Sequence, residues 1–246
     1  MFGANRQRKQ AVVADLTTQL ERSKALVEQR ADADPVPGLT ALSAWQVQRL
    51  RDTYRDFLDD PRHRPVLAFF QTDLYGSQDF SQRDLDLLKI APIMSRVMPA
   101  EILHVAARAI ELNVVSQELD ERLARELFET MQVESVTPEN YTEGYRRMDE
   151  RPKREHQIAL VVEVCEDLGR YCEQRWLRTA MHLAHRPSEM VGLSALHHFL
   201  ERGIDAFATM GDPRDFLQAL ENRETVLMER IFANDPDPFR NIRNGA

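Results

Sequence analysis

The chain has 246 residues, a net charge of −8 and only 9 glycines. A chain of this length can bury roughly 70–75% of its unfolded surface, so it needs no disulfide or metal to fold. The shortage of glycine argues against β sandwiches and barrels, which use glycine in tight turns. Acidic residues outnumber basic ones 40 to 32, whereas nucleic-acid binders carry basic faces. We therefore expect no nucleic-acid partner.

The two cysteines and the hydropathy pattern indicate where the protein works. Cys165 and Cys172 are seven residues apart, which on one helix is about 10.5 Å along the axis and too far for a disulfide. Unbridged thiols are typical of a reducing compartment. The N-terminal residues lack the apolar core of a signal peptide, and no stretch approaches the ~18 uninterrupted apolar residues of a membrane helix. We expect a cytoplasmic protein without a membrane partner.

The first predicted element is an amphipathic helix over residues 5–31, with a narrow apolar stripe like that of a short coiled coil. Prolines and a glycine at 35–38 end it. This is the one clear internal boundary, and it leaves open whether the helix is a detached arm or part of the core. The predicted organisation is an N-terminal helix or arm at 1–34, a linker at 35–41, a helical bundle at 42–233 and a flexible tail at 234–246.

The central part of the chain predicts three more helices. One covers residues 42–58, and a short buried one begins at Val66. The next starts at Ser81, where Asp84 three residues later completes a capping pattern, and it ends near Val97. Phe80 and Leu85 fit the hydrophobic staple of the same helix start.

In the C-terminal part of the chain, prolines mark the predicted starts of helices. Long helices are predicted from Pro99 to Met131 and from Pro152 to about Leu183. Between them a short helix should start at Thr137-Pro138, with Thr137 as its cap and Pro138 as its first residue. In the 152–183 helix we expect the apolar stripe, Trp176 and Leu183 included, to face the core. Pro187 should begin the next helix, and Pro213 the last one. The pattern thus predicts an all-α fold, a multi-helix bundle of about eight or nine helices.

Three groups of residues could carry chemistry, and each has a structural alternative. Tyr75, Asp79 and Arg83 could line a small ligand pocket at one helix junction, or simply anchor and cap it. Glu224 lies on the apolar stripe of the last helix and Arg175 beside another stripe. A carboxylate facing a core needs a partner, so Glu224 is either half of an internal ion pair or a ligand-binding acid.

Histidines form the third group. His182 and His185 are one turn apart on one helix, and His197 and His198 follow on the next. If the two helices are antiparallel, His182, His185 and His197 could approach one another and bind zinc or haem. In the alternative, these imidazoles favour a helix C-terminus or cap the edge of the core. Glu101-x-x-His104 resembles half of a di-iron motif, but the chain has no second copy.

The sequence lacks the common catalytic and nucleotide-binding motifs, including Gly-x-Gly-x-x-Gly, the Walker loop, Gly-x-Ser-x-Gly and His-Glu-x-x-His. We therefore expect no cofactor and no catalytic residue, although an enzyme is not excluded.

Two stretches carry a resemblance. Phe-Phe-x-x-x-Leu-Tyr-Gly-x-x-Asp-Phe-x-x-Arg-Asp, from Phe69 to Asp84, resembles a signature of a family of uncharacterised bacterial helical proteins. Leu196 to Gly203, and on to Glu224, is similar to the C-terminal half of that family. The resemblance implies a bacterial helical protein and transfers no activity.

Two hypotheses about function remain. In the first, the chain is a non-catalytic interaction or regulatory module that binds a protein partner or itself. In the second, the bundle encloses a small ligand or a metal between the histidines and Glu224. The arrangement of these side chains in space discriminates between the two.

Overall fold

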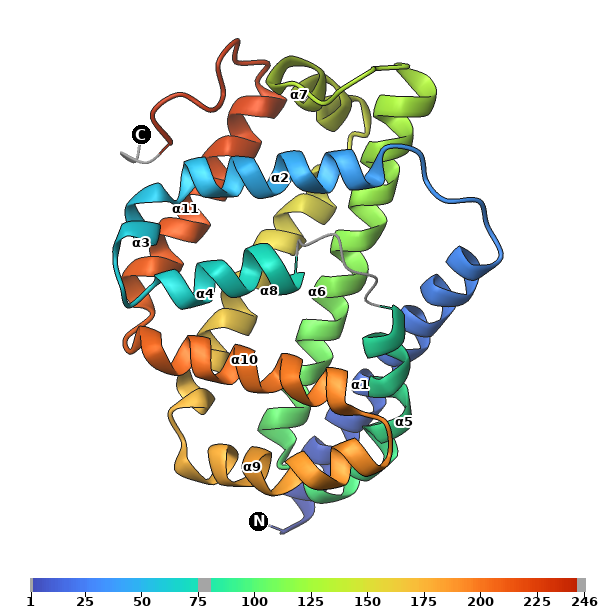
Figure 1. The fold of residues 1–246 in the computed structure, drawn as a ribbon, viewed down its shortest axis with the longest axis vertical. Coiled ribbons are helices and arrows are strands. Elements are labelled where there is room, and N and C mark those ends of the chain that lie inside the picture. The colour runs from blue at the N-terminus through green and yellow to red at the C-terminus, as the bar shows by residue number, and fades with distance from the viewer. Residues whose placement is uncertain (1, 75–80, 243–246) are drawn as a thin grey trace. The chain divides into compact units, whose positions relative to one another are not determined.

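The computed structural model describes residues 2–74 and 81–242, without the side chains of 2–5, 31, 74, 81–85, 88, 91 and 187. The described chain is 81% helical, contains no strand, and has eleven α-helices, nine of them of seven residues or more (Figure 1). The predicted all-α bundle is therefore confirmed. The elements are α1 (Phe2–Ala31), α2 (Leu39–Thr53), α3 (Arg55–Asp59), α4 (Arg64–Phe69), η1 (Phe70–Leu74), α5 (Ser81–Val97), α6 (Ala100–Arg125), η2 (Glu126–Thr130), α7 (Pro138–Arg147), α8 (Arg151–Cys172), α9 (Arg175–Met190), α10 (Ser194–Met210) and α11 (Arg214–Phe232).

The helices group into two compact units. Unit 1 comprises residues 1–35, 79–114 and 174–201, and unit 2 comprises residues 36–78, 115–173 and 202–246. The predicted boundary after residue 34 lies next to a division between the units. Another division, between residues 173 and 174, coincides with the break between α8 and α9, whereas two more fall inside α6 and α10, where the sequence carries no linker signal.

The core of unit 1 involves the N-terminal helix. α1 packs along α5, and its apolar stripe is buried together with residues from the first half of α6. The buried members of this cluster are Leu16, Leu20, Leu26, Leu103, Ala107, Ile110 and Val114. Within unit 1, α1 is thus a packed helix whose stripe has a partner.

In unit 2, α8 and α11 pack along each other, and α7 lies against both α11 and η2. The apolar residues of its core come from several parts of the chain: Leu42, Leu123, Ala124, Leu127, Tyr141, Tyr145, Leu227, Met228, Ile231 and Ile242. Both cysteines are buried as free thiols on α8, and burial raises the pKa of Cys165 to about 12. A thiol with so high a pKa is a packing group and not a nucleophile.

Local signals explain several helix starts. Gly38 precedes α2 with φ 71, and a Cβ there would meet the Phe128 ring at 2.1 Å, so only glycine fits. Thr137 caps α7 through a capping box in which its hydroxyl accepts from the Asn140 amide and the Asn140 side chain accepts from the Thr137 amide. α5 begins at Ser81 as predicted. The side chains of the predicted cap and staple, from Phe80 to Leu85, lie outside the described residues.

The prediction of one long helix from Pro152 to Leu183 is wrong. α8 ends at Cys172, and Gln174 adopts an extended conformation before α9 begins at Arg175. The prediction that Pro187 begins a helix is also wrong, because α9 continues through Pro187 to Met190. The chain turns instead at Gly192, which has φ 74. As a consequence, Trp176 and Leu183 belong to a different helix from the one expected, and they are exposed.

None of the described helices is long and apolar enough to cross a lipid bilayer.

The capping box generates a test of local stability. Thr137→Ala removes the side chain that accepts from the Asn140 amide, and we expect the free energy of unfolding to fall by about 1 kcal/mol. Urea denaturation measures this change. Thr40→Ala, at an exposed position of α2, is the matched control and should change the free energy of unfolding by less than about 0.5 kcal/mol. An equal effect of both substitutions would contradict the role of the cap.

Candidate functional site

The predicted pocket at the junction before α5 stays a prediction. Tyr75 and Asp79 lie outside the described residues. Arg83 lies within α5, but its side chain is outside the described part.

Glu224, the acid predicted to face the core, lies in an internal polar network of unit 2. Arg49 of α2 donates to Glu224 Oε1 at 2.6 Å, and the Tyr54 hydroxyl donates to the same oxygen at 3.0 Å. The Arg49 and Glu224 side chains are only 13% and 19% exposed. Arg175 is an exposed residue of α9 in the other unit. Glu224 thus has the geometry of an internal ion pair.

Charge and burial set the protonation of this network. Burial raises the pKa of Tyr54 well above its usual value, and the negative charge of Glu224 adds to the rise. Burial alone would lower the pKa of Arg49, but the Glu224 carboxylate raises it above its usual value. Tyr54 therefore stays neutral and Arg49 stays charged, so this network is suited to holding α2 on α11 and not to proton transfer.

A second ion pair of unit 2 lies near the first. Arg223 donates to both carboxylate oxygens of Asp56, at 2.8 and 2.6 Å, and to the Thr53 carbonyl. The hydrogen bond from Arg223 lowers the pKa of Asp56. This pair ties α11 to the junction of α2 and α3.

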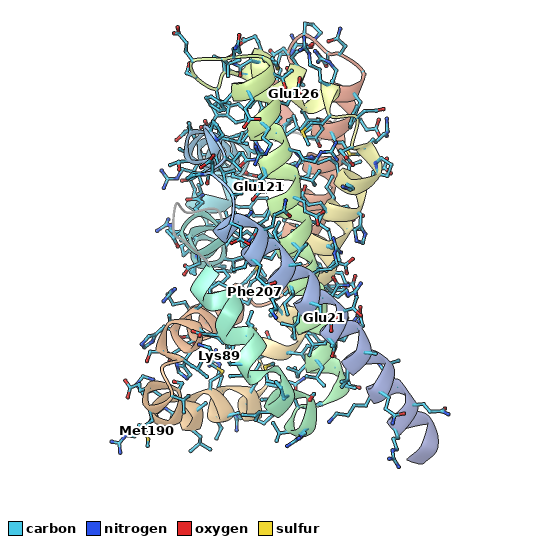
Figure 2. All side chains as sticks on the ribbon, turned by 90° about the vertical axis from the view of Figure 1, so that its right-hand side faces the viewer. Glu21, Lys89, Glu121, Glu126, Met190 and Phe207 are labelled. Carbon is cyan, nitrogen blue, oxygen red and sulfur yellow. The ribbon has the colours of Figure 1, made fainter. Side chains whose placement is uncertain are left out.

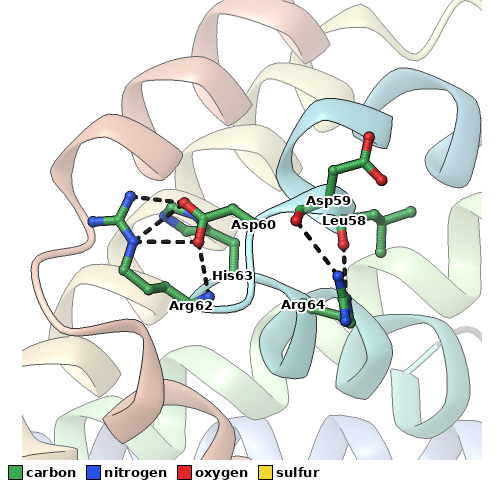
Figure 3. Close-up of polar contacts among 6 residues, drawn as sticks. All are labelled: Leu58, Asp59, Asp60, Arg62, His63 and Arg64. Carbon is green, nitrogen blue, oxygen red and sulfur yellow. Dashed lines mark hydrogen bonds and ion pairs between the residues drawn. The ribbon is translucent and has the colours of Figure 1, made fainter.

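The turn between α3 and α4 is also closed by its own charges (Figure 3). Arg62 donates to both oxygens of Asp60 and thereby lowers the pKa of that carboxyl. Arg64 donates to the Leu58 carbonyl at 2.9 Å. The buried ring of His63 packs against Phe57 and Phe216, with ring centres 5.0 and 5.9 Å away. These groups contact one another across the turn, which points to a structural role.

The histidines of unit 1 converge at the turn between α9 and α10. Gly192 adopts the left-handed conformation, its amide donates to the Glu189 carbonyl at 3.2 Å, and the Leu193 amide donates to the Ser188 carbonyl at 2.7 Å. This pattern is a Schellman motif, which reverses the chain within a few residues. It places the last turns of α9 beside the first turns of α10.

Three imidazole rings meet there. The ring centre of His185 is 5.1 Å from that of His197 and 5.8 Å from that of His198, and the last two are 5.9 Å apart. Glu201, one turn after His198, adds a carboxylate. One ligand atom from each of His197, His198 and Glu201 lies within 4.8 Å of the others. Such a set of nitrogen and oxygen ligands can hold a transition metal.

The sequence-predicted metal ligands are therefore only partly the residues that meet. His185 and His197 come together, whereas His182 is exposed one turn earlier on α9. Sequence reasoning did not select His198 and Glu201 as ligands. The available signal was Val191-Gly192-Leu193, a glycine followed by an apolar residue, which is typical of a helix C-terminus. Pro187, which is typical of a helix start, pointed to a different boundary.

The second surface feature of unit 1 is apolar. The large exposed apolar side chains among the described residues are Ile93, Val97, Trp176, Leu183, Met190 and Val191, all of them in unit 1. Trp176, Leu183 and Met190 are spaced by seven residues on α9, and Figure 2 labels Met190 at the end of that helix. Residues seven apart lie on nearly the same side of a helix. α9 thus presents an apolar stripe to solvent.

A comparison with protein-family models identifies the chain. The model of a domain of unknown function, DUF8198, matches residues 25–238. The chain belongs to the DUF8198 family. This confirms the expectation of an uncharacterised family. No curated protein and no solved structure matches the chain.

The two stretches that carried the resemblance contact each other in this DUF8198 chain. The Arg202 guanidinium donates to Asp73 at 3.0 Å. The backbone of Gly203 lies so close to Phe69 that a Cβ would be 3.0 Å from the ring. These two contacts of unit 2 join the two stretches, and the one between Phe69 and Gly203 joins residues that belong to the quoted patterns.

The ion pair at Glu224 of the DUF8198 chain can be tested by double substitution. Glu224→Ala leaves the largely buried charge of Arg49 without its partner, and we expect a loss of about 3 kcal/mol in the free energy of unfolding. Arg49→Met with Glu224→Leu removes both charges and should cost less than Glu224→Ala alone. Urea denaturation measures both values, and Glu221→Ala, exposed one turn earlier on α11, is the control. A double variant less stable than the single one would contradict the pairing.

The buried tyrosines of unit 2 generate a pH test. Burial raises the pKa of Tyr141, although the nearby Arg49 opposes the rise. A raised folded-state pKa means that stability is full below the unfolded-state pKa of about 10 and falls as the pH rises above it. Tyr141→Phe should therefore lose less stability than the wild type between pH values of about 8 and 11. Equal slopes in urea denaturation across this range would refute the expectation.

Proposed function

We propose that this protein is a non-catalytic helical interaction module that associates with a second copy of itself through α9. The observation that carries the proposal is the exposed stripe of Trp176, Leu183 and Met190, residues that are 41%, 70% and 86% exposed. Exposed apolar side chains gain free energy when a partner covers them. Scattered exposed residues are common on proteins, but a row along one helix is typical of an interaction surface.

The spacing of the stripe favours a helix as the occupant. Apolar residues at seven-residue spacing form the seam of helix pairs, and fourteen residues of helix extend the seam over roughly 21 Å. Trp176 is held in place because its indole donates to the Gln174 side chain at 2.5 Å. A single seam of this length buries less area than a stable dimer needs, so we expect weak, concentration-dependent association.

Charge favours a second copy over an unrelated partner. Arg175 directly precedes Trp176 at one end of the stripe, and Glu189 directly precedes Met190 at the other end. Both lie on the same side of the stripe, because each is one position before a stripe residue. When two such helices pair antiparallel about a twofold axis, Arg175 of one copy lies beside Glu189 of the other, twice by symmetry. Unrelated partners need not carry this match.

The setting we infer is the bacterial cytoplasm, without a nucleic-acid or membrane partner. The net charge of −8 supports the first exclusion, and two buried free cysteines suit a reducing compartment. No catalytic role is assigned to any residue.

The stripe is tested by the mass of the protein in solution. Sedimentation equilibrium over a range of concentrations should show a weight-average mass that rises towards the dimer for the wild type. Leu183→Glu places a charge in the middle of the seam and should keep the mass at that of the monomer. Ile93→Glu, which adds the same charge at an exposed apolar position of α5, should leave association unchanged.

The charge match separates a second copy from other occupants. Arg175→Glu or Glu189→Arg alone should weaken association, and the two together should restore it, because the pair is re-formed with reversed polarity. A wild-type protein that stays monomeric at the highest soluble concentration would contradict the proposal. A double variant that associates no more strongly than the single variants would also overturn the proposal.

A further inference from the structure

We propose that the turn between α9 and α10 is a transition-metal site of the Zn²⁺ class, with His197, His198 and Glu201 as ligands and His185 as the fourth. This site is independent of the association of two copies through the outward side of α9. It differs from the sequence hypothesis because His198 and Glu201 take the place of His182.

The distances are close to those of a bound ion. Two ligand atoms of a tetrahedral zinc ion are roughly 3.3 Å apart, since Zn–N and Zn–O bonds are about 2.0–2.2 Å. His198 Nδ1 is 3.6 Å from Glu201 Oε2. Imidazole ligands of one such ion have ring centres roughly 5 Å apart, and the three rings here are 5.1 to 5.9 Å apart. Small side-chain rotations therefore bring the ligands to an ion.

His197 supplies an independent observation that points to a ligand. Its side chain is buried, with 5% of the residue exposed. Nε2 lies 2.9 Å from the Met181 carbonyl, which can only accept, so Nε2 carries the proton. Nδ1 then holds a lone pair, and it is buried without a hydrogen-bond partner. A histidine that donates one N–H to a backbone carbonyl and keeps the other nitrogen free has the arrangement of most metal-bound histidines.

The carboxylates around the rings favour a cation. Glu201 and Glu189 lie 3.6 Å from nitrogens of His198 and His185, beyond ordinary hydrogen-bond distance. Neutral imidazoles with carboxylates suit Zn²⁺ and its neighbours, whereas Mg²⁺ and Ca²⁺ prefer oxygen ligands. His185 is half-buried on α9, and its ligation would join α9 to α10 through the ion. A bound ion should therefore stabilise the folded chain.

The test uses the full chain without a polyhistidine tag, stripped with EDTA. Titration with Zn²⁺ by calorimetry should give one ion per chain with a dissociation constant of about 1 μM or tighter. Co²⁺ should give the visible absorption bands of a tetrahedral site, and Zn²⁺ should raise the melting temperature. His198→Ala and Glu201→Ala should each weaken Zn²⁺ binding by about tenfold or more, and His185→Ala should remove the tetrahedral Co²⁺ spectrum.

His182→Ala is the matched control, because His182 is exposed on the same helix one turn before His185. It should change the dissociation constant by less than about twofold. The side chains of His198 and Glu201 are about half exposed, at 48% and 47%, so their replacement leaves the fold intact, which circular dichroism checks. Absent binding of Zn²⁺ overturns the proposal. Binding that His182→Ala weakens as much as His198→Ala overturns it as well.

Discussion

The left-handed conformation of Gly192 is the constraint on which the surface features of unit 1 depend. With φ 74, it closes α9 and lets the chain reverse before α10. A Cβ at this glycine would meet nothing within 4 Å, so the backbone angle and not packing requires glycine. The reversal brings His185 beside His197 and His198, while Trp176, Leu183 and Met190 of α9 are exposed.

The polar groups of unit 2 hold its helices together. Glu224 and the buried Arg223 each have a partner of opposite charge, Arg49 and Asp56, which offsets the cost of burying a charge. Arg49 Nε, Arg154 Nη2 and His63 Nδ1 of unit 2 are buried without a hydrogen-bond partner, like His197 Nδ1, but His63 Nδ1 lies 3.2 Å from the Asp60 carboxylate. Guanidinium nitrogens are donors only and repel cations, whereas the imidazole nitrogen offers a lone pair. For this reason the histidine turn, and not the ion-pair network, is the candidate site.

The two sides of α9 therefore have different roles. The side that faces α10 carries His185, and the opposite side carries the stripe centred on Leu183. In our proposals, an ion holds α9 on α10 while the stripe contacts a second copy. The two proposals are independent of each other, because the ion and the second copy contact different sides of α9.

The sequence by itself determined the helical class, the start of α5 at Ser81 and the cap at Thr137, because these depend on residues within one or two turns. It also placed Glu224 on a core-facing stripe. It did not determine the end of α8, since Glu173-Gln174 carries neither glycine nor proline. Only the tertiary structure decided that Arg49 partners Glu224 and that the ring of His198 lies beside that of His185. Such pairings join residues that are distant in the chain or that lie on either side of a chain reversal. Helical periodicity does not indicate the direction in which a helix packs.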